Sequence, residues 1–172
     1  MQTSLVLTLL GPDRAGLVNS IAEAVKAHQG NWQESRMVHL AGQFAGLVHV
    51  SLPQTQVTDL KQALQVLQNQ DLQILVQESA ITDNPRTLTH LSLELLGLDR
   101  PGIIHDITRQ LAALNVNIEE LESEQRAAPM SNEMLFYAHL QLGLPPGVTA
   151  EDVQGVFESM PDPLTVDLTF SQ

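Results

Sequence analysis

Residues 9–21 read LLGPDRAGLVNSI, and residues 95–107 read LLGLDRPGIIHDI. The second stretch follows the first by 95 − 9 = 86 residues, which is half of the 172-residue chain. A period of this length is too long for a solenoid repeat and long enough for a small domain. The sequence therefore predicts two copies of one fold, each with its glycine-containing motif directly after an apolar run.

The hydrophobic period changes at each motif. Leucines occupy alternate positions before it, which is typical of a strand with one buried face: Leu5, Leu7 and Leu9, then Leu91, Leu93 and Leu95. After the motif, apolar residues recur at helical spacing in both copies: Leu17, Val18, Ile21, Ala22 and Val25, then Ile103, Ile104, Ile107, Leu111 and Leu114. Gly30 and Asn115 are candidates for left-handed residues that end these helices.

The rest of each half repeats one order of elements. Hairpins are expected from strands 31–40 and 44–52, and from strands 117–124 and 134–142. A helix beginning at Thr58 or Asp59 and another capped by Thr149 follow, and strands 72–76 and 164–170 close the two halves. Matching His49 with His139 makes the offset 139 − 49 = 90, so four extra residues are expected in the second hairpin loop, near 128–131.

Strand, helix, strand, strand, helix, strand is the order of the ferredoxin-like βαββαβ unit. The expected fold class is therefore α+β, with two antiparallel sheets that each carry two helices on one face. The expected domains are residues 1–80 and 88–172, joined by a linker at 81–87 that contains a Thr-Asp-Asn-Pro turn sequence. Apolar residues on both strand faces, including Leu47, Leu75 and Tyr137, predict that a partner, either the other half of the chain or another subunit, covers part of each sheet.

Composition excludes several classes of function. With 8 basic and 20 acidic residues the net charge is −12, which disfavours direct binding to nucleic acid or to an anionic membrane. The chain has no cysteine and no apolar run long enough for a membrane span, and the expected location is the cytoplasm. The six histidines show no metal-ligand spacing and no catalytic constellation stands out, so we expect no metal, no cofactor and no enzymatic activity.

The shared motif Gly-x-Asp-Arg-x-Gly lies where a strand passes into a helix. Gly11 and Gly97 are expected to take backbone angles closed to other residues, and Asp13 and Asp99 are expected to cap the helix N-termini. Pro101 suits the first helical turn, where its missing N–H costs nothing. Gly16 and Gly102 also fall in that turn, where glycine weakens a helix, so close approach by a chain segment or ligand is the expected reason for them.

A helix start of this kind is a natural seat for a carboxylate. Asn31 and Asn117 are again 117 − 31 = 86 residues apart, at the start of the second strand of each copy. An asparagine amide can bind both the carboxylate and the ammonium group of an amino acid. The alternative interpretations are an ordinary tight turn for the motif, retained through duplication, and a left-handed turn residue for each asparagine.

The motif, the helix and the following Asn-(Trp/Ile)-x-Glu resemble the ACT domain, a small regulatory module that binds amino acids. The second copy is close to the family pattern, whereas the first has Ala15 where proline is usual and Trp32 where isoleucine or valine is usual. A free-standing pair of such modules resembles the glycine cleavage system transcriptional repressor family. Members of that family lack a DNA-binding domain and act through a DNA-binding regulator protein.

The resemblance implies a site for a small amino acid, with glycine as one candidate, at an interface between paired modules in a homo-oligomer. The turn of one module would face the second-strand start of another. The ligand-binding residues that it implies are Asp13, Arg14, Gly16, Leu17 and Asn31, together with Asp99, Arg100, Gly102, Ile103 and Asn117. The second copy is expected to be the better binding site. The alternative is an interaction scaffold whose ligand site is vestigial.

Overall fold

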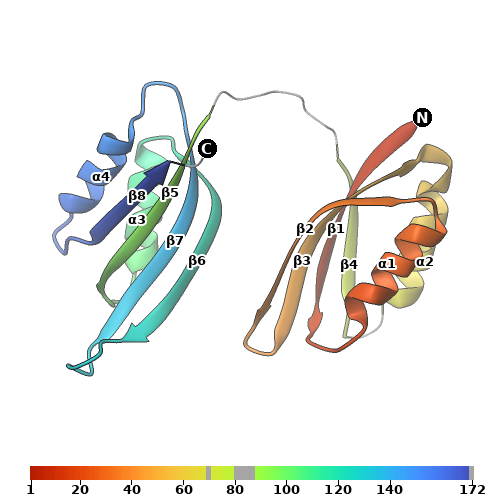
Figure 1. The fold of residues 1–172 in the computed structure, drawn as a ribbon, viewed down its shortest axis with the longest axis horizontal. Coiled ribbons are helices and arrows are strands. Elements are labelled where there is room, and N and C mark those ends of the chain that lie inside the picture. Colours follow the sequence, from red (N-terminus) through yellow and green to blue (C-terminus); the bar gives the residue numbers. More distant parts are fainter. Residues whose placement is uncertain (69–70, 80–87, 171–172) are drawn as a thin grey trace. The chain divides into compact units, whose positions relative to one another are not determined.

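The computed structural model describes residues 1–68, 71–79 and 88–170 (Figure 1). The chain divides into two compact units, residues 1–83 and 84–172, which are called the first and second module below. The linker expected at residues 81–87 lies outside the described residues. Each module is an α+β unit with the expected order of elements, and the two are described separately.

The first module has one four-stranded antiparallel sheet in the order β2-β3-β1-β4. Its elements are β1 (Gln2–Pro12), α1 (Leu17–Ala27), β2 (Asn31–Leu40), β3 (Gln43–Pro53), the short 3-10 turn η1 (Gln54–Gln56), α2 (Val57–Leu67) and β4 (Gln73–Glu78). The helix α2 begins one residue earlier than the sequence predicted, after Gln56, and no side chain caps it.

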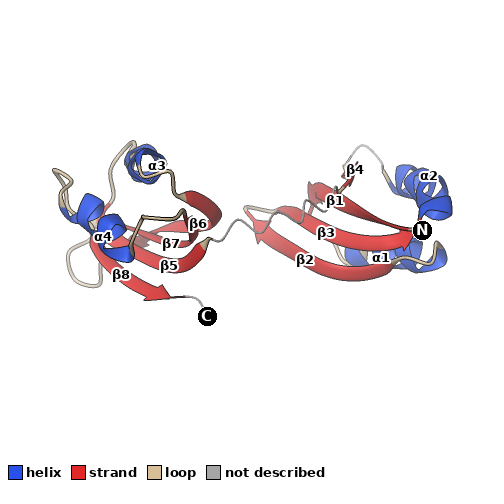
Figure 2. Ribbon diagram, turned by 90° about the horizontal axis from the view of Figure 1, so that it is seen from above, coloured by secondary structure: helices blue, strands red, loops and turns tan. Residues whose placement is uncertain are grey.

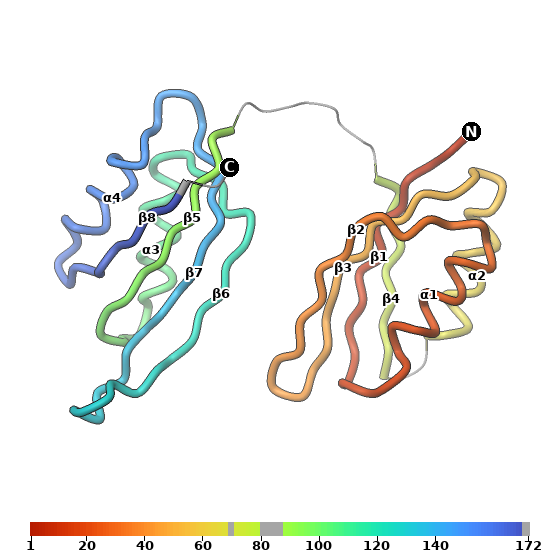
Figure 3. Tube along the Cα trace, viewed as in Figure 1, coloured from red at the N-terminus to blue at the C-terminus, as the bar shows by residue number. Residues whose placement is uncertain are grey.

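The second module repeats the arrangement with the order β6-β7-β5-β8 (Figure 3). Its elements are β5 (Thr89–Leu98), α3 (Ile103–Ala113), β6 (Asn117–Ala127), β7 (Met134–Leu144), α4 (Ala150–Glu158) and β8 (Thr165–Phe170). The expected cap at Thr149 is confirmed. Its side chain accepts from the backbone N–H of Asp152, whose carboxylate accepts from the N–H of Thr149 in return.

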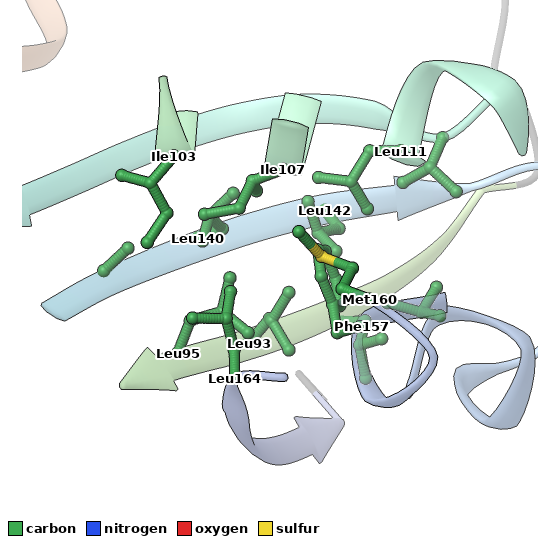
Figure 4. Packing of buried hydrophobic residues seen from close by; sticks show 14 of the residues in the cluster. Leu93, Leu95, Ile103, Ile107, Leu111, Leu140, Leu142, Phe157, Met160 and Leu164 are labelled. Atoms are coloured by element: carbon green, nitrogen blue, oxygen red, sulfur yellow. The ribbon is translucent and has the colours of Figure 1, made fainter. Parts of the chain in front are cut away.

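Both helices of a module pack on one face of its sheet (Figure 2) because alternate strand residues are apolar on that side. In the first module the predicted leucines Leu5, Leu7 and Leu9 are fully buried against α1 and α2. In the second, Leu93 and Leu95 pack with Ile107, Leu140 and Phe157 (Figure 4). Because these cores contain few aromatic side chains, they depend on close packing of aliphatic ones.

The β6–β7 hairpin is six residues longer than the β2–β3 hairpin: the loop has four more residues, as expected, and each strand extends by one more at the hairpin end. Phe44 lies opposite Gly11 and Phe136 opposite Gly97, so the third strands are offset by 136 − 44 = 92 while the first strands are offset by 97 − 11 = 86. His49 and His139 are therefore not equivalent: His49 lies opposite Val6, and His139 lies opposite Glu94. The single-residue match misled the sequence alignment by two positions.

The helix ends also differ from expectation in one module. Asn115 takes the left-handed conformation predicted for it, with φ of 57°. In the first module the left-handed residue is Gln29, also at φ 57°, rather than Gly30. Gly30 is needed for space instead, because a Cβ there would lie 2.7 Å from Cγ1 of Val25.

The sheet faces turned away from the helices differ between the modules. On the first sheet this open face carries exposed aliphatic side chains, namely Leu10, Val38, Leu40, Leu47 and Leu75. On the second sheet the corresponding face is acidic, with Glu94, Glu120, Glu122, Glu124 and Asp167. There Arg126 lies over the ring of Tyr137 at 3.7 Å, and the Tyr137 hydroxyl donates to Glu94.

Candidate functional site

The strand-to-helix turn of each module is fastened to the adjacent hairpin by a backbone hydrogen bond. The N–H of Asp13 donates to the carbonyl of Gly42 at 3.2 Å, and the N–H of Asp99 donates to the carbonyl of Met134 at 3.0 Å. The motif aspartates therefore occupy equivalent positions in the two modules. The turns formed by residues 13–16 and 99–102 are called the first and second turn below.

Gly16 and Gly102 are the N-cap residues of α1 and α3, and neither helix start has a side-chain cap. Their φ angles are 85° and 80°, in the left-handed region that glycine adopts at little cost. A Cβ at either position would meet nothing within 4 Å, so close approach is not the reason for these glycines. The expected capping by Asp13 and Asp99 is wrong, and Pro101 precedes the helix rather than lying in it.

Close approach instead explains the first glycine of each motif. Gly11 and Gly97 do not have positive φ angles. A Cβ on Gly11 would lie 2.8 Å from the backbone oxygen of Asp71, and one on Gly97 would lie 2.4 Å from Cδ2 of Leu164. The roles predicted for the two motif glycines are thus exchanged: the strand glycine provides space, and the helix-start glycine provides backbone conformation.

The aspartate carboxylates turn toward the second strand. Oδ2 of Asp13 lies 3.5 Å from Nε2 of His39, and Oδ2 of Asp99 accepts from the Gln125 amide at 2.6 Å. His39 and Gln125 were not predicted as site residues. Their spacing, 125 − 39 = 86, equals that of the motif and could have identified them as a third repeated pair beside Asn31 and Asn117.

A hollow adjoins each turn. The one in the first module has a volume of about 300 Å³ and is lined by Arg14, Ala15, Gly16, Leu17, Ser20, Ile21, Leu67 and Leu72. The one in the second module, of about 360 Å³, is lined by Leu98, Asp99, Arg100, Ile103, Asp162, Pro163 and Leu164. Both bring together the motif arginine, the first helical residue and a leucine that precedes the last strand. Each could hold a small ligand, with helix N–H groups and a guanidinium available to a carboxylate.

The two motif arginines have different surroundings. Arg100 is partly buried, with Nη1 2.7 Å from Oδ2 of Asp106 in α3 and Nε 3.6 Å from Oδ2 of the exposed Asp162. The Arg100 hydrogen bond is the main cause of the lowered pKa of the Asp106 carboxyl, followed by the hydrogen bond of His105. In contrast, Arg14 is exposed and forms no ion pair within the part of the chain that the structure describes.

Asn31 and Asn117 lie far from the turn of their own module. Asn31 is opposite Ser51, which is opposite Ser4 near the start of β1, whereas the turn follows the end of β1. Nine residues of strand separate Ser4 from Asp13, or about 30 Å at 3.3 Å per residue. Asn117 has the same placement, opposite Gly143 and then His90. The structure therefore brings the predicted turn residues together but leaves both asparagines at the other end of the sheet.

Known proteins resemble this chain in sequence and in fold. Residues 3–77 match the family model of the ACT domain. The glycine cleavage system transcriptional repressor of Escherichia coli is 29% identical over 163 residues, which cover 92% of this chain and 84% of that protein. An unknown protein from Galdieria sulphuraria has 29% identity and a TM-score of 0.80, with both chains fully covered.

A third relative shows the fold alone. The crystal structure of a candidate glycine cleavage system transcriptional repressor has a TM-score of 0.71 at 18% identity, over 99% of both chains. Residues 3–77 thus match the ACT domain, and each module has the ferredoxin-like order of strands and helices. Over most of its length the chain is similar to the glycine cleavage system transcriptional repressor of Escherichia coli.

No group of three or more His, Asp or Glu side chains in the described ranges is placed to hold a metal ion. Within the same ranges, no helix has both the length and the apolar composition that crossing a membrane requires.

Proposed function

We propose that this chain is a regulatory protein that senses a small amino acid at a strand-to-helix turn. The observation that carries the proposal is the first turn, where an uncapped helix N-terminus, the exposed Arg14 and a hollow of about 300 Å³ adjoin one another. Backbone N–H groups and a guanidinium suit the carboxylate that all amino acids share. Leu17 and Leu72 provide an apolar wall suited to a small side chain.

Glycine is the first candidate for the ligand, because the 29% identical relative is named for the glycine cleavage system. The same relative is named a transcriptional repressor, and regulation of transcription is the proposed role here. A net charge of −12 disfavours contact with DNA, so the proposed route is a DNA-binding regulator protein as partner. The proposed location is the cytoplasm, where such a partner acts.

A second copy of the chain is proposed to complete the site. β2 is an edge strand, and it runs from Asn31 to the hairpin that holds the first turn. An antiparallel β2 from another copy would place that copy's Asn31 near the turn, because opposite strand ends meet in antiparallel pairing. This arrangement would bring an asparagine amide to the ammonium and carboxylate of the ligand.

The alternative function is an interaction scaffold with a vestigial ligand site. It is favoured in the second module by the ion pairs that already occupy Arg100. In a scaffold, partner binding would be unaffected by any amino acid, and this separates it from the sensor.

A thermal-shift screen with glycine and the other standard amino acids tests the proposal. A ligand at 100 times its Kd adds about 2.7 kcal/mol of stability. At roughly 2–4 °C per kcal/mol for a chain of this size, the expected rise in Tm is several degrees. Arg14→Gln should remove the shift, whereas Lys26→Gln, which removes the same charge from the far end of α1, should retain it. Absence of a shift with every amino acid at millimolar concentration would refute the sensor.

A further inference from the structure

We infer that the carboxylates of Asp106 and Asp162 occupy the position beside Arg100 where the carboxylate of a ligand would otherwise bind. The equivalent position beside Arg14, in the first module, is open. The two turns then differ in ligand chemistry: the first accepts an amino acid carboxylate, and the second is closed to it by the protein's own carboxylates. The inference rests on the proposed function, because it names which of two similar turns binds.

The geometry of Arg100 supports closure. Its Nη1 and Nε, two separate donors of one guanidinium, point to carboxylates from two different elements, at 2.7 Å and 3.6 Å. Asp106 lies in the first turns of α3, and Asp162 lies in the connection between α4 and β8. The contact with Asp106 has the length of a charge-assisted hydrogen bond, which is about twice as strong as a neutral one, so an incoming carboxylate would have to displace Asp106.

The hollows around Arg100 support the same conclusion. A further hollow of about 290 Å³ is lined by Arg100, Asp106 and Asp162 together with residues of α3 and of the segment after α4. Arg100 and Asp162 also line the 360 Å³ hollow beside the second turn. Arg100 and Asp162 therefore line both spaces, and an anion that approaches Arg100 from either one meets the carboxylate of Asp162.

The first module has a neutral residue where the second has Asp106. The position equivalent to Asp106 is 106 − 86 = 20, and Ser20 occupies it. Its hydroxyl donates to the carbonyl of Gly16 at 3.1 Å, within the helix start. No ion pair holds Arg14 in the described ranges, and Arg14 and Ser20 line the same hollow. The guanidinium of the first turn therefore remains available to a ligand.

This assignment reverses the expectation from the motif. The second copy has the family's proline and isoleucine at Pro101 and Ile118, and on sequence it is the better match. Residues outside the motif, Asp106 and Asp162, decide whether its arginine is available. Specificity can be set by a competing or repulsive group as well as by attractive contacts to the ligand.

Isothermal titration of the full chain with glycine, using reciprocal exchanges at the equivalent positions, tests the inference. The wild-type chain is expected to take one glycine, Ser20→Asp none, and the double variant Asp106→Ser with Asp162→Asn two. The control is Glu151→Gln, which removes one exposed acidic charge from the second module and should leave the binding of one glycine per chain unchanged. Asp152→Asn does not serve as a control, because it disturbs the cap of α4. Two glycines bound by the wild-type chain, or only one by the double variant, would overturn the inference.

Phenylglyoxal labelling of arginines, followed site by site by mass spectrometry, tests closure without any amino acid present. Arg14 is expected to react several-fold faster than Arg100 in the wild-type chain. In the double variant the Arg100 rate should rise toward the Arg14 rate, while Arg14 itself serves as an unchanged internal reference. Equal wild-type rates, or no change in the variant, would overturn closure. If neither the wild-type chain nor any variant binds glycine, but Arg100 still reacts slowly with phenylglyoxal, the proposed sensing of glycine is wrong and the closure of the second turn by Asp106 and Asp162 is supported.

Discussion

The first strand of each module ends against the segment that leads into the last strand, but the contact differs. At Gly11 the neighbouring atom is a backbone oxygen, that of Asp71, whereas at Gly97 it is the tip of the Leu164 side chain. The backbone path is the same in both modules, yet one contact is rigid and the other can yield. The same close approach is thus made by backbone in the first module and by a side chain in the second.

The largest difference is expected for Gly11→Ala compared with Gly97→Ala. Added volume in a packed interior typically costs about 1–3 kcal/mol, and Gly11→Ala should lie at the upper end because backbone must move. Gly97→Ala should cost less, since Leu164 can change rotamer. Hydrogen exchange of peptides from each module, measured on the full chain, would report the two costs separately. Equal losses of protection would mean that both contacts are equally rigid.

A smaller and equal effect is expected for Gly16→Ala and Gly102→Ala. Both glycines have left-handed φ angles with open space around the Cβ position, so only backbone strain applies, about 1–2 kcal/mol. Chemical denaturation followed by module-specific exchange would measure it. Gly155→Ala in α4 is the matched control with opposite sign, because a helical glycine with open space gains stability on substitution, by up to about 1 kcal/mol. Unequal losses at the two turns would show that their helix starts differ in more than side chains.

The smallest effect is expected at the second helix of each module. Thr149→Ala removes a reciprocal cap and should destabilise the second module by about 1 kcal/mol. Gln56→Ala, at the equivalent cap of α2, should change little because no side chain caps that helix. Urea denaturation midpoints of the two variants would provide the comparison. A loss at Gln56 as large as that at Thr149 would contradict it.

Much of the fold could be predicted because the leucine alternation that defines β1 and β5 is also the burial pattern of the cores. The turns could be located for the same reason. The exchange of glycine roles could not be predicted, since it depends on Asp71 and Leu164, which contact the motif from distant parts of the chain. The ion pair between Arg100 and Asp162 could not be predicted from the sequence either, because the two residues are 162 − 100 = 62 positions apart. No spacing rule connects a turn to a loop so much later in the chain.

The acidic face of the second sheet has a consequence for solubility. β6 is an edge strand, and an exposed edge is a template for pairing with other chains. Glu120, Glu122 and Glu124 place a carboxylate at every second position along this edge. Two such edges brought together would repel one another through these like charges. Salt screens charges at the surface, so a high salt concentration weakens this protection and makes the chain more prone to associate through this edge.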